Sequence, residues 1–123
     1  EMKGEMLKTI LEDVADNLFN PDPYYQQGGD MVRVGGLTYA CDPLAGMGKR
    51  ITDMRLKGQP IDAGKNYLVA GWAPVSEEAA KSGNKMVWDL VEEWLKARGG
   101  KVAPRKLNSP KLTGGLPNPG YAA

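Results

Sequence analysis

The residues in this chain that could do chemistry are few, and the strongest nucleophile has no partner. The 123 residues contain one cysteine, Cys41, and no histidine. Nucleophilic cysteines need a base that takes their proton, and histidine is the commonest general base. A lone cysteine in an apolar, strand-like run more often packs as a small hydrophobic residue. We therefore expect Cys41 to be buried and to have no catalytic role, and a single cysteine also excludes an internal disulfide.

The carboxylates next come into question as metal ligands or acid–base groups. Asp42, Asp53 and Asp62 each lie beside a turn or on the solvent side of a strand. Aspartates at turns accept hydrogen bonds from nearby backbone N–H groups, which explains these positions without any reaction. Calcium and magnesium loops need several acidic residues at fixed offsets, and this sequence contains no such pattern. The sequence predicts neither catalytic residues nor metal ligands.

Aromatic and cationic side chains are better candidates, for binding rather than catalysis. Tyr24, Tyr25 and Gln26 lie in a loop bounded by proline, where exposure is slightly favoured. Arg33 could clamp an anion such as a sulfonate, or could simply face solvent from a strand. Trp72 ends a strand, where it lines a ligand cleft or packs against a helix. These five residues are the predicted substrate-binding set.

An amphipathic helix precedes the first of these residues and must position them. Apolar side chains recur at helical spacing from Lys3 to about Leu18, and the polar side chains Lys8, Glu12 and Asp16 fall mainly on the other side. The segment Asn20–Pro23 ends this helix, because proline cannot continue the hydrogen-bond ladder. The apolar positions are Leu7, Ile10, Leu11, Val14 and Leu18.

Three strands are predicted next. Val32–Cys41 contains the pair Gly35–Gly36, which favours a bulge, and Tyr67–Trp72 is the third strand. Between them, Ile51–Lys57 alternates with period two, so Thr52, Met54 and Leu56 are expected on the buried side. The short connection between the first two strands favours antiparallel pairing.

A second amphipathic helix begins near Asn84 or Lys85 and ends at Gly99–Gly100, with Trp94 on its apolar side as an expected core residue. Residues 76–81 form a loop or a short helix. The order of elements predicts an α+β fold with a small antiparallel or mixed sheet packed with two helices. We expect one domain in residues 1–100 and an extended tail in 101–123, either mobile or laid across a partner.

Composition excludes several classes of protein. The formal net charge is +1, and no basic block exists that would follow a nucleic-acid backbone. No apolar run approaches the roughly 20 residues that span a bilayer. The first residues lack the pattern of a signal peptide, although Glu1 resembles the middle of a longer chain. Nucleic acid and membrane are therefore not expected as partners.

The spacing of many residues resembles the C-terminal domain of the 5′-nucleotidase family, in one register from Lys3 to about Ala73. The matching residues are Gly4, Leu7, Lys8, Leu11, Glu12, Gly35, Gly36, Asp42, Pro43, Gly48, Arg50, Ile51, Leu56, Gly58, Pro60, Ile61, Asp62, Tyr67, Val69 and Ala70. Within the family, residues 15–33, residues 69–73 and the tail around 107–110 resemble the SoxB group of thiosulfohydrolases.

The SoxB resemblance implies a periplasmic hydrolase that releases sulfate from a cysteine S-thiosulfonate on the carrier protein SoxYZ. It implies two manganese ions in an N-terminal metallophosphoesterase domain, and it makes this chain the latter part of the C-terminal domain. That fragment would help form the substrate cleft and would lack the metal site, and it is expected to be inactive alone.

Two alternatives to the SoxB interpretation stay open. One is a nucleoside-binding C-terminal domain of a 5′-nucleotidase or cyclic phosphodiesterase, and the other is a free-standing binding module. Nucleotidases usually carry Asn-Asp-Phe or a similar sequence after the third strand, whereas this chain has Gly71-Trp72-Ala73. The difference points away from a nucleobase.

Overall fold

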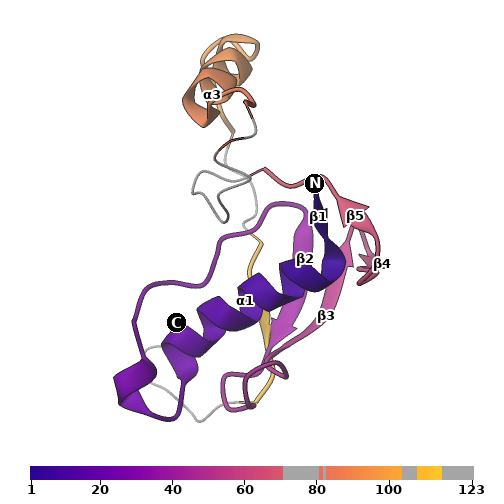
Figure 1. Ribbon diagram of the computed structural model, residues 1–123. Helices are drawn as coiled ribbons and strands as arrows, with labels where there is room; N and C mark the ends of the chain where they lie inside the picture. The colour runs from indigo at the N-terminus through magenta and orange to yellow at the C-terminus, as the bar shows by residue number, and fades with distance from the viewer. Residues whose placement is uncertain (71–80, 82, 104–107, 115–123) are drawn as a thin grey trace. The chain divides into compact units, whose positions relative to one another are not determined.

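The structure is a computed structural model, and it describes residues 1–70, 81, 83–103 and 108–114 (Figure 1). Contacts divide the chain into two compact units. The first holds Glu1–Tyr67 together with the described residues 108–114, and the second holds the described residues between 68 and 103. The expected division into residues 1–100 and 101–123 stays a prediction.

The first helix, α1 (Gly4–Phe19), confirms the expected helix to within one residue at each end. Its residue Lys3 provides no side-chain cap. Instead, the backbone N–H groups of Gly4 and Glu5 donate to the carbonyl oxygens of Lys65 and Ala63, at 3.1 and 3.0 Å. These bonds satisfy donors that a helix leaves unpaired in its first turn. The start of α1 is thus fixed to a loop some sixty residues later in the chain.

The apolar side of α1 is buried as expected, but its polar side is not uniformly exposed. Leu11 and Ala15 are buried, and Leu7, Ile10, Val14 and Leu18 are partly buried. Glu12, which the spacing places on the polar side of the helix, is nevertheless only 4% exposed. Its carboxylate accepts hydrogen bonds from a loop that crosses the helix, and this compensates for its burial.

A four-stranded sheet lies against α1, in the order β4-β3-β2-β6 (Figure 1). The central pair β2 (Leu37–Cys41) and β3 (Ile51–Leu56) is antiparallel, as predicted. β4 (Gln59–Pro60) turns back antiparallel along β3, and β6 (Lys111–Leu112) joins β2 in parallel. A separate antiparallel pair consists of β1 (Met2–Lys3) and β5 (Asn66–Tyr67).

Two predicted strands are shorter than expected. The prediction of a strand from Val32 is wrong, because β2 begins only after Gly36, whose φ of +80° departs from the extended conformation. The third strand, predicted over Tyr67–Trp72, includes only Asn66–Tyr67 among the described residues. Its ladder ends there because the paired strand β1 has only two residues. The segment 76–81 lies outside the described residues except for Lys81.

The alternation predicted along β3 is interrupted by a bulge. Asp53 and Met54 together stand opposite Tyr39, because Thr38 pairs with Arg55 and Ala40 pairs with Thr52. Asp53 has a φ of +48°, a left-handed conformation that aspartate tolerates better than most residues. This extra residue turns Thr52 to solvent, contrary to prediction, and brings both Ile51 and Met54 to the core.

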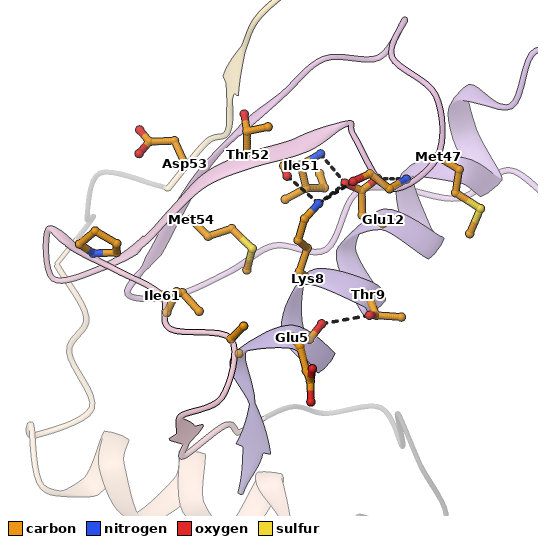
Figure 2. Close-up of a pocket in the computed structure, with 14 residues that line it drawn as sticks. Glu5, Lys8, Thr9, Glu12, Met47, Ile51, Thr52, Asp53, Met54 and Ile61 are labelled. Carbon is orange, nitrogen blue, oxygen red and sulfur yellow. Dashed lines mark hydrogen bonds and ion pairs between the residues drawn. The ribbon is translucent and has the colours of Figure 1, made fainter.

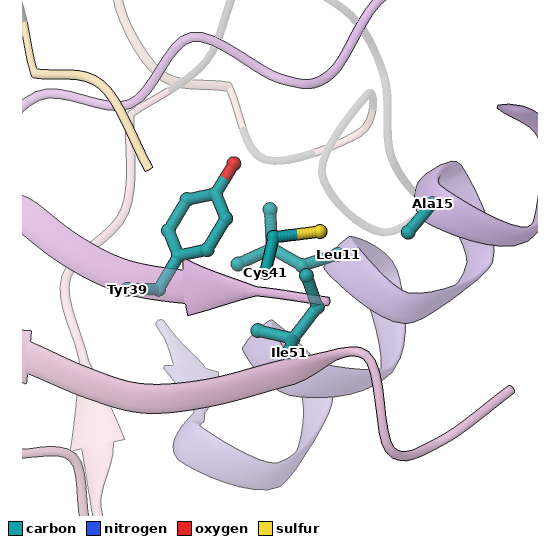
Figure 3. Packing of buried hydrophobic residues seen from close by; sticks show 5 residues of the cluster. All are labelled: Leu11, Ala15, Tyr39, Cys41 and Ile51. Carbon is teal, nitrogen blue, oxygen red and sulfur yellow. The ribbon is translucent and has the colours of Figure 1, made fainter. Parts of the chain in front are cut away.

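The core of this unit is small and lies between α1 and the central strands (Figure 3). It consists of Leu11, Ala15, Tyr39, Cys41 and Ile51, each at most 4% exposed. Burial of a leucine or isoleucine side chain contributes about 1.5–3 kcal/mol. The burial of Cys41 confirms its predicted structural role. Phe19, Met31, Val34, Leu37 and Met54 pack around this cluster.

The second unit contains α3 (Val87–Lys96), which confirms the second predicted helix with a start two to three residues later. The N–H of Gly100 donates to the carbonyl oxygen of Leu95, and Gly99 and Gly100 both have positive φ, so the predicted glycine stop is confirmed. None of the residues of α3 is buried. The prediction that Trp94 is a core residue is wrong: it is 37% exposed, with the guanidinium of Arg98 4.0 Å from its ring centroid.

The described part of the tail is more ordered than predicted. β6 extends the sheet on the β2 side, and the N–H of Thr113 donates to the carbonyl oxygen of Cys41 at 2.8 Å. The side-chain amide of Asn108 donates to the backbone carbonyl oxygen of Leu37 at 3.3 Å. At least this part of the tail therefore lies on its own domain. Among the described helices, none is long and apolar enough to cross a membrane.

Candidate functional site

The most exposed aromatic side chains of the first unit lie just after α1. We define the aromatic turn as residues Asn20–Gln26, which include the 3-10 turn η1 (Pro23–Tyr25). Tyr24 is 88% exposed and Tyr25 is 59% exposed. Their ring centroids are 5.5 Å apart and the ring planes meet at 88°, an edge-to-face pair. This turn therefore presents two large aromatic surfaces that the fold does not cover.

The sequence of the aromatic turn explains its shape. The side chain of Asp22 caps η1 by accepting a hydrogen bond from the backbone N–H of Tyr24 at 2.9 Å. Pro23, with its fixed φ, occupies the position directly after this cap, where proline is favoured. The amide of Gln26 donates to the carbonyl oxygen of Asn20 at 2.7 Å and closes the turn. The two tyrosine rings are thus carried by a hydrogen-bonded backbone.

A chain of polar contacts ties the aromatic turn to the body of the domain. Arg50 is only 1% exposed, and its guanidinium donates to Asp16 at 2.6 Å and to the carbonyl oxygen of Phe19 at 3.1 Å. Asp16 also accepts a hydrogen bond from the side chain of Asn20 at 2.8 Å. The hydrogen bonds from Arg50 and then from Asn20 lower the pKa of Asp16 below its ordinary value. Asp16 therefore stays ionised between a buried cation and the start of the turn.

The other predicted binding residues lie elsewhere or outside the described residues. Arg33 is exposed, in the segment without regular structure that precedes β2. In the described parts of the chain, no acidic group forms an ion pair with Arg33. Trp72 belongs to the residues that the structure does not describe. The structure therefore brings together Tyr24, Tyr25 and Gln26, and the roles of all five stay predictions.

A second polar centre joins α1 to the loop before β3 (Figure 2). We call it the charged junction, and it consists of Lys8, Glu12 and the loop residues from Gly48 to Ile51. The Glu12 carboxylate accepts hydrogen bonds from the backbone N–H groups of Gly48, Arg50 and Ile51 at 2.9, 3.3 and 2.8 Å. The Lys8 ammonium donates to Glu12 at 2.7 Å and to the carbonyl oxygens of Gly48 and Ile51.

These contacts decide the charge state of Glu12. Burial by itself raises the pKa of the carboxyl group, but the hydrogen bond from Lys8, the backbone N–H groups and the charge of Lys8 together outweigh it, and the pKa is lowered. Glu12 is therefore ionised, and its lone pairs are used in holding the loop. An ionised carboxylate that is occupied in this way is suited to structure rather than to proton transfer.

A groove of about 630 Å³ opens beside the charged junction, between the first half of α1 and the strands β3 and β4 (Figure 2). Its floor is largely apolar, with Ile51, Met54 and Ile61, and Lys8 and Glu12 lie at one side. Tyr24, Tyr25, Gln26 and Arg33, the predicted binding residues that the structure describes, do not line it. The groove is thus a feature that sequence analysis did not foresee.

The aspartates have the structural roles that the sequence predicts. Asp42 accepts a hydrogen bond from the N–H of Leu44, and Asp62 accepts one from the N–H of Gly64, at 3.0 and 2.9 Å. Asp53 pairs with Arg55 on the exposed surface. Burial, and next the nearby Glu12 carboxylate, raise the pKa of the Cys41 thiol, which disfavours the reactive thiolate. The described residues contain no cluster of three or more groups suited to holding a metal ion.

The hydrogen-bonded position of the aromatic turn was not predicted from the sequence. The segment Asn20–Pro23 was interpretable only as a helix stop, yet Asp22 directly before Pro23 is the pattern of a capping residue followed by proline at the first helical position. That signal predicts a further short turn after α1. The contact between Asp16 and Arg50 had no such signal, since 34 residues separate them.

Residues 1–78 match the family described as 5′-nucleotidase, C-terminal domain. Among solved structures, the chain is similar to the sulfate thiohydrolase SoxB of Thermus thermophilus in complex with glycerol, at 32% identity and a TM-score of 0.73. The match covers 94% of this chain and 22% of that chain. No curated protein sequence matches the chain. The similarity confirms the predicted α+β fold of this domain type.

Proposed function

The chain belongs to the 5′-nucleotidase C-terminal domain family, and from this premise we propose that it forms part of the substrate cleft of a SoxB-like thiosulfohydrolase. Such an enzyme would release sulfate from a cysteine S-thiosulfonate on the carrier SoxYZ, in the periplasm. The chain spans 22% of the similar SoxB chain, so the remaining machinery would come from other parts of a longer protein.

The observation that carries this proposal is the exposed pair Tyr24 and Tyr25 on a hydrogen-bonded turn. Aromatic surfaces on a fixed backbone bind a peptide with little loss of conformational entropy. A carrier arm that bears a thiosulfonate offers both a peptide backbone and an anionic head. In the proposal, the tyrosine rings contact the arm, the ordered amide of Gln26 limits motion of the turn, and Arg33 faces the sulfonate.

The chain's share of the reaction is binding and orientation. The described residues do not fit a metal centre, since no cluster of suitable ligands occurs among them. In the proposal, a metallophosphoesterase domain holds the two manganese ions, and none of this chain's residues is assigned a step of bond cleavage. Orientation of the substrate by residues outside the metal centre still contributes to the rate.

The geometry of the tyrosine pair favours this function over nucleoside binding. A base held between two rings requires the rings to be parallel, whereas Tyr24 and Tyr25 are nearly perpendicular and the edge of one faces the other. The described residues therefore offer no slot for a base between these rings. A saturable adenosine signal, absent for a thiosulfonate peptide, would support the nucleoside alternative instead.

The proposal is tested with the full-length protein that carries this chain, supplied with Mn²⁺ and thiosulfonated SoxYZ. We expect the double variant Tyr24→Ala/Tyr25→Ala to raise KM for the carrier by about tenfold, the effect of losing ring contacts worth about 1.4 kcal/mol. The matched control is Leu44→Ala, which removes an apolar side chain of intermediate exposure, 67%, from another loop. An unchanged KM in the tyrosine variant, or an equal change in the control, would refute the proposal.

The 123-residue chain alone provides a second test. Because the metal ligands of the proposal lie outside it, we expect no sulfate release from thiosulfonated SoxYZ by the purified chain, with or without added Mn²⁺. Ion chromatography of sulfate measures this directly. Metal-dependent release by the chain would show that catalytic residues do reside in it.

A further inference from the structure

Two polar residues of the aromatic turn, Asn20 and Asp22, accept hydrogen bonds that hold the backbone carrying the tyrosine rings. We propose that Asn20 and Asp22 are positioning residues that set Tyr24 and Tyr25 for the carrier arm. This inference rests on the proposed function, because it assumes that the tyrosines contact the substrate.

The two residues act through successive hydrogen bonds. The side-chain oxygen of Asn20 accepts from the backbone N–H of Asp22 at 3.0 Å. The side-chain carboxylate of Asp22 accepts a hydrogen bond from the backbone N–H of Tyr24. The backbone carbonyl oxygen of Asp22 accepts one from the N–H of Tyr25 at 3.1 Å. Each step fixes the backbone two or three residues further along, and the last step fixes the residues that carry the rings.

The first residue of this series is held from the opposite side. The side-chain nitrogen of Asn20 donates to Asp16, which the buried Arg50 holds at 2.6 Å. The carbonyl oxygen of Asn20 accepts from Gln26, which returns the far end of the turn to its start. A continuous path of contacts thus runs from the loop before β3, through α1, to the tyrosine pair.

The energetic argument separates positioning from stability. The aromatic turn is exposed apart from Asn20, and none of its residues belongs to the core. Loss of the Asp22 cap therefore frees the turn locally and leaves the core intact. A free turn must be ordered again when the substrate binds, and that cost appears in the apparent affinity rather than in the rate of bond cleavage.

The test compares Asp22→Ala with Asp22→Asn in the full-length protein, by steady-state sulfate release from thiosulfonated SoxYZ. Asparagine keeps the oxygen that accepts from Tyr24 and is an equally good cap, whereas alanine removes it. We expect Asp22→Ala to raise KM about fivefold, with kcat within about twofold of the original value. Asp22→Asn should have the KM of the original protein. Asn20→Ala should resemble Asp22→Ala.

A second measurement is independent of activity. Hydrogen exchange at the Tyr24 amide should become faster in Asp22→Ala and stay slow in Asp22→Asn, because that amide donates to the Asp22 side chain. The midpoint of thermal unfolding should be the same in both variants. A lower midpoint that accounts for the lost activity of Asp22→Ala would show a merely structural role and overturn the inference.

The outcomes distinguish the two proposals. If Tyr24→Ala/Tyr25→Ala raises KM but Asp22→Ala does not, the positioning role fails and the proposed function stands. If the tyrosine variant itself leaves KM unchanged, the proposed function fails and the positioning role fails with it. A raised KM in both, with rescue by asparagine, supports the two proposals together.

Discussion

The charged junction and the aromatic turn contact the same helix, yet they differ in almost every physical property. In the junction, Glu12 is buried and its carboxylate accepts hydrogen bonds from three backbone N–H groups and from Lys8. In the turn, Tyr24 and Tyr25 are largely exposed, and their rings contact each other. The polar groups of the charged junction form hydrogen bonds within the domain, whereas the aromatic side chains of the turn remain exposed and available to a partner.

This difference separates the residues that hold the domain together from those proposed to bind. The residues that carry the family resemblance include Lys8, Glu12, Gly48, Arg50 and Ile51, and all of them lie in or beside the junction. Their spacing therefore specifies the packing of α1 on the loop before β3. Tyr24, Tyr25 and Gln26, which are proposed for binding, follow this helix in a turn that is hydrogen-bonded to it, and their side chains take no part in the junction.

The largest expected effect is the loss of the junction's acceptor. Glu12→Ala leaves the backbone donors of Gly48, Arg50 and Ile51 and the ammonium of Lys8 without their partner. We expect the free energy of unfolding to fall by about 3 kcal/mol, measured by urea denaturation.

The same helix offers a matched control for this prediction. Glu5 is exposed and pairs with Lys3 at 3.7 Å, so Glu5→Ala should change the stability by less than about 0.5 kcal/mol. Equal effects at the two glutamates would show that the junction is no more important than an ordinary surface pair, and the contrast drawn above would not hold.

A close backbone approach gives the next effect. A Cβ atom at Gly4 would collide with the backbone of Asp62 and lie 2.7 Å from a methyl carbon of Ile61. Although alanine favours helices over glycine, we expect Gly4→Ala to destabilise the domain by about 2 kcal/mol, measured by thermal denaturation.

Gly64→Ala is the control for this steric argument. A Cβ at Gly64 would meet only the Asp62 side chain at an ordinary distance of 3.7 Å. We expect the free energy of unfolding of Gly64→Ala to stay within about 0.5 kcal/mol of that of the original protein. A stabilised Gly4→Ala variant would mean that α1 begins further from the loop after β4 than the structure places it.

Acid should weaken the junction and the path from Arg50 to the turn together. Glu12 and Asp16 both have pKa values lowered in the folded state, below ordinary values of 4.5 and 3.8. A carboxylate with a lowered pKa stabilises the fold fully above its unfolded pKa, and this contribution is lost as the pH falls through the folded pKa. Stability should therefore decline as the pH falls below about 4.5.

The variant Asp16→Asn isolates one part of this dependence. It removes the titrating group beside Arg50, so the protein should be less stable at neutral pH and should lose less stability on acidification. Urea midpoints measured between neutral pH and the onset of acid unfolding test this. An unchanged pH dependence would exclude Asp16 as a contributor.

The sequence was sufficient for features that depend on local pattern. Helical spacing predicted α1 and α3, and the turn roles of Asp42 and Asp62 followed from aspartate's tendency to accept nearby N–H groups. Features that join distant segments were not predictable in this way. Glu12 has the same residue type as an exposed helix residue, and only the crossing loop, 36 to 39 residues later, makes it buried.

The same reason explains the errors in the strands. Period two along Ile51–Lys57 assumes an uninterrupted ladder, whereas the bulge at Asp53 depends on how β2 pairs with β3. β6 has two residues and no pattern of its own, so its position depends on the free edge of β2. In the candidate site, exposure of Tyr24 and Tyr25 was foreseen, but the hydrogen bonds that hold them needed the structure.

The smallest expected effect on stability completes the contrast between the two regions. Tyr24→Ala/Tyr25→Ala removes side chains that are 88% and 59% exposed and lie outside the core. The backbone hydrogen bonds of the turn do not involve the rings, so we expect the free energy of unfolding to change by less than about 0.5 kcal/mol. Urea denaturation of this variant and of Glu12→Ala under the same conditions compares the two losses of stability. A loss comparable to that of Glu12→Ala would mean that the rings support the fold, and their exposure would then no longer favour a role in binding.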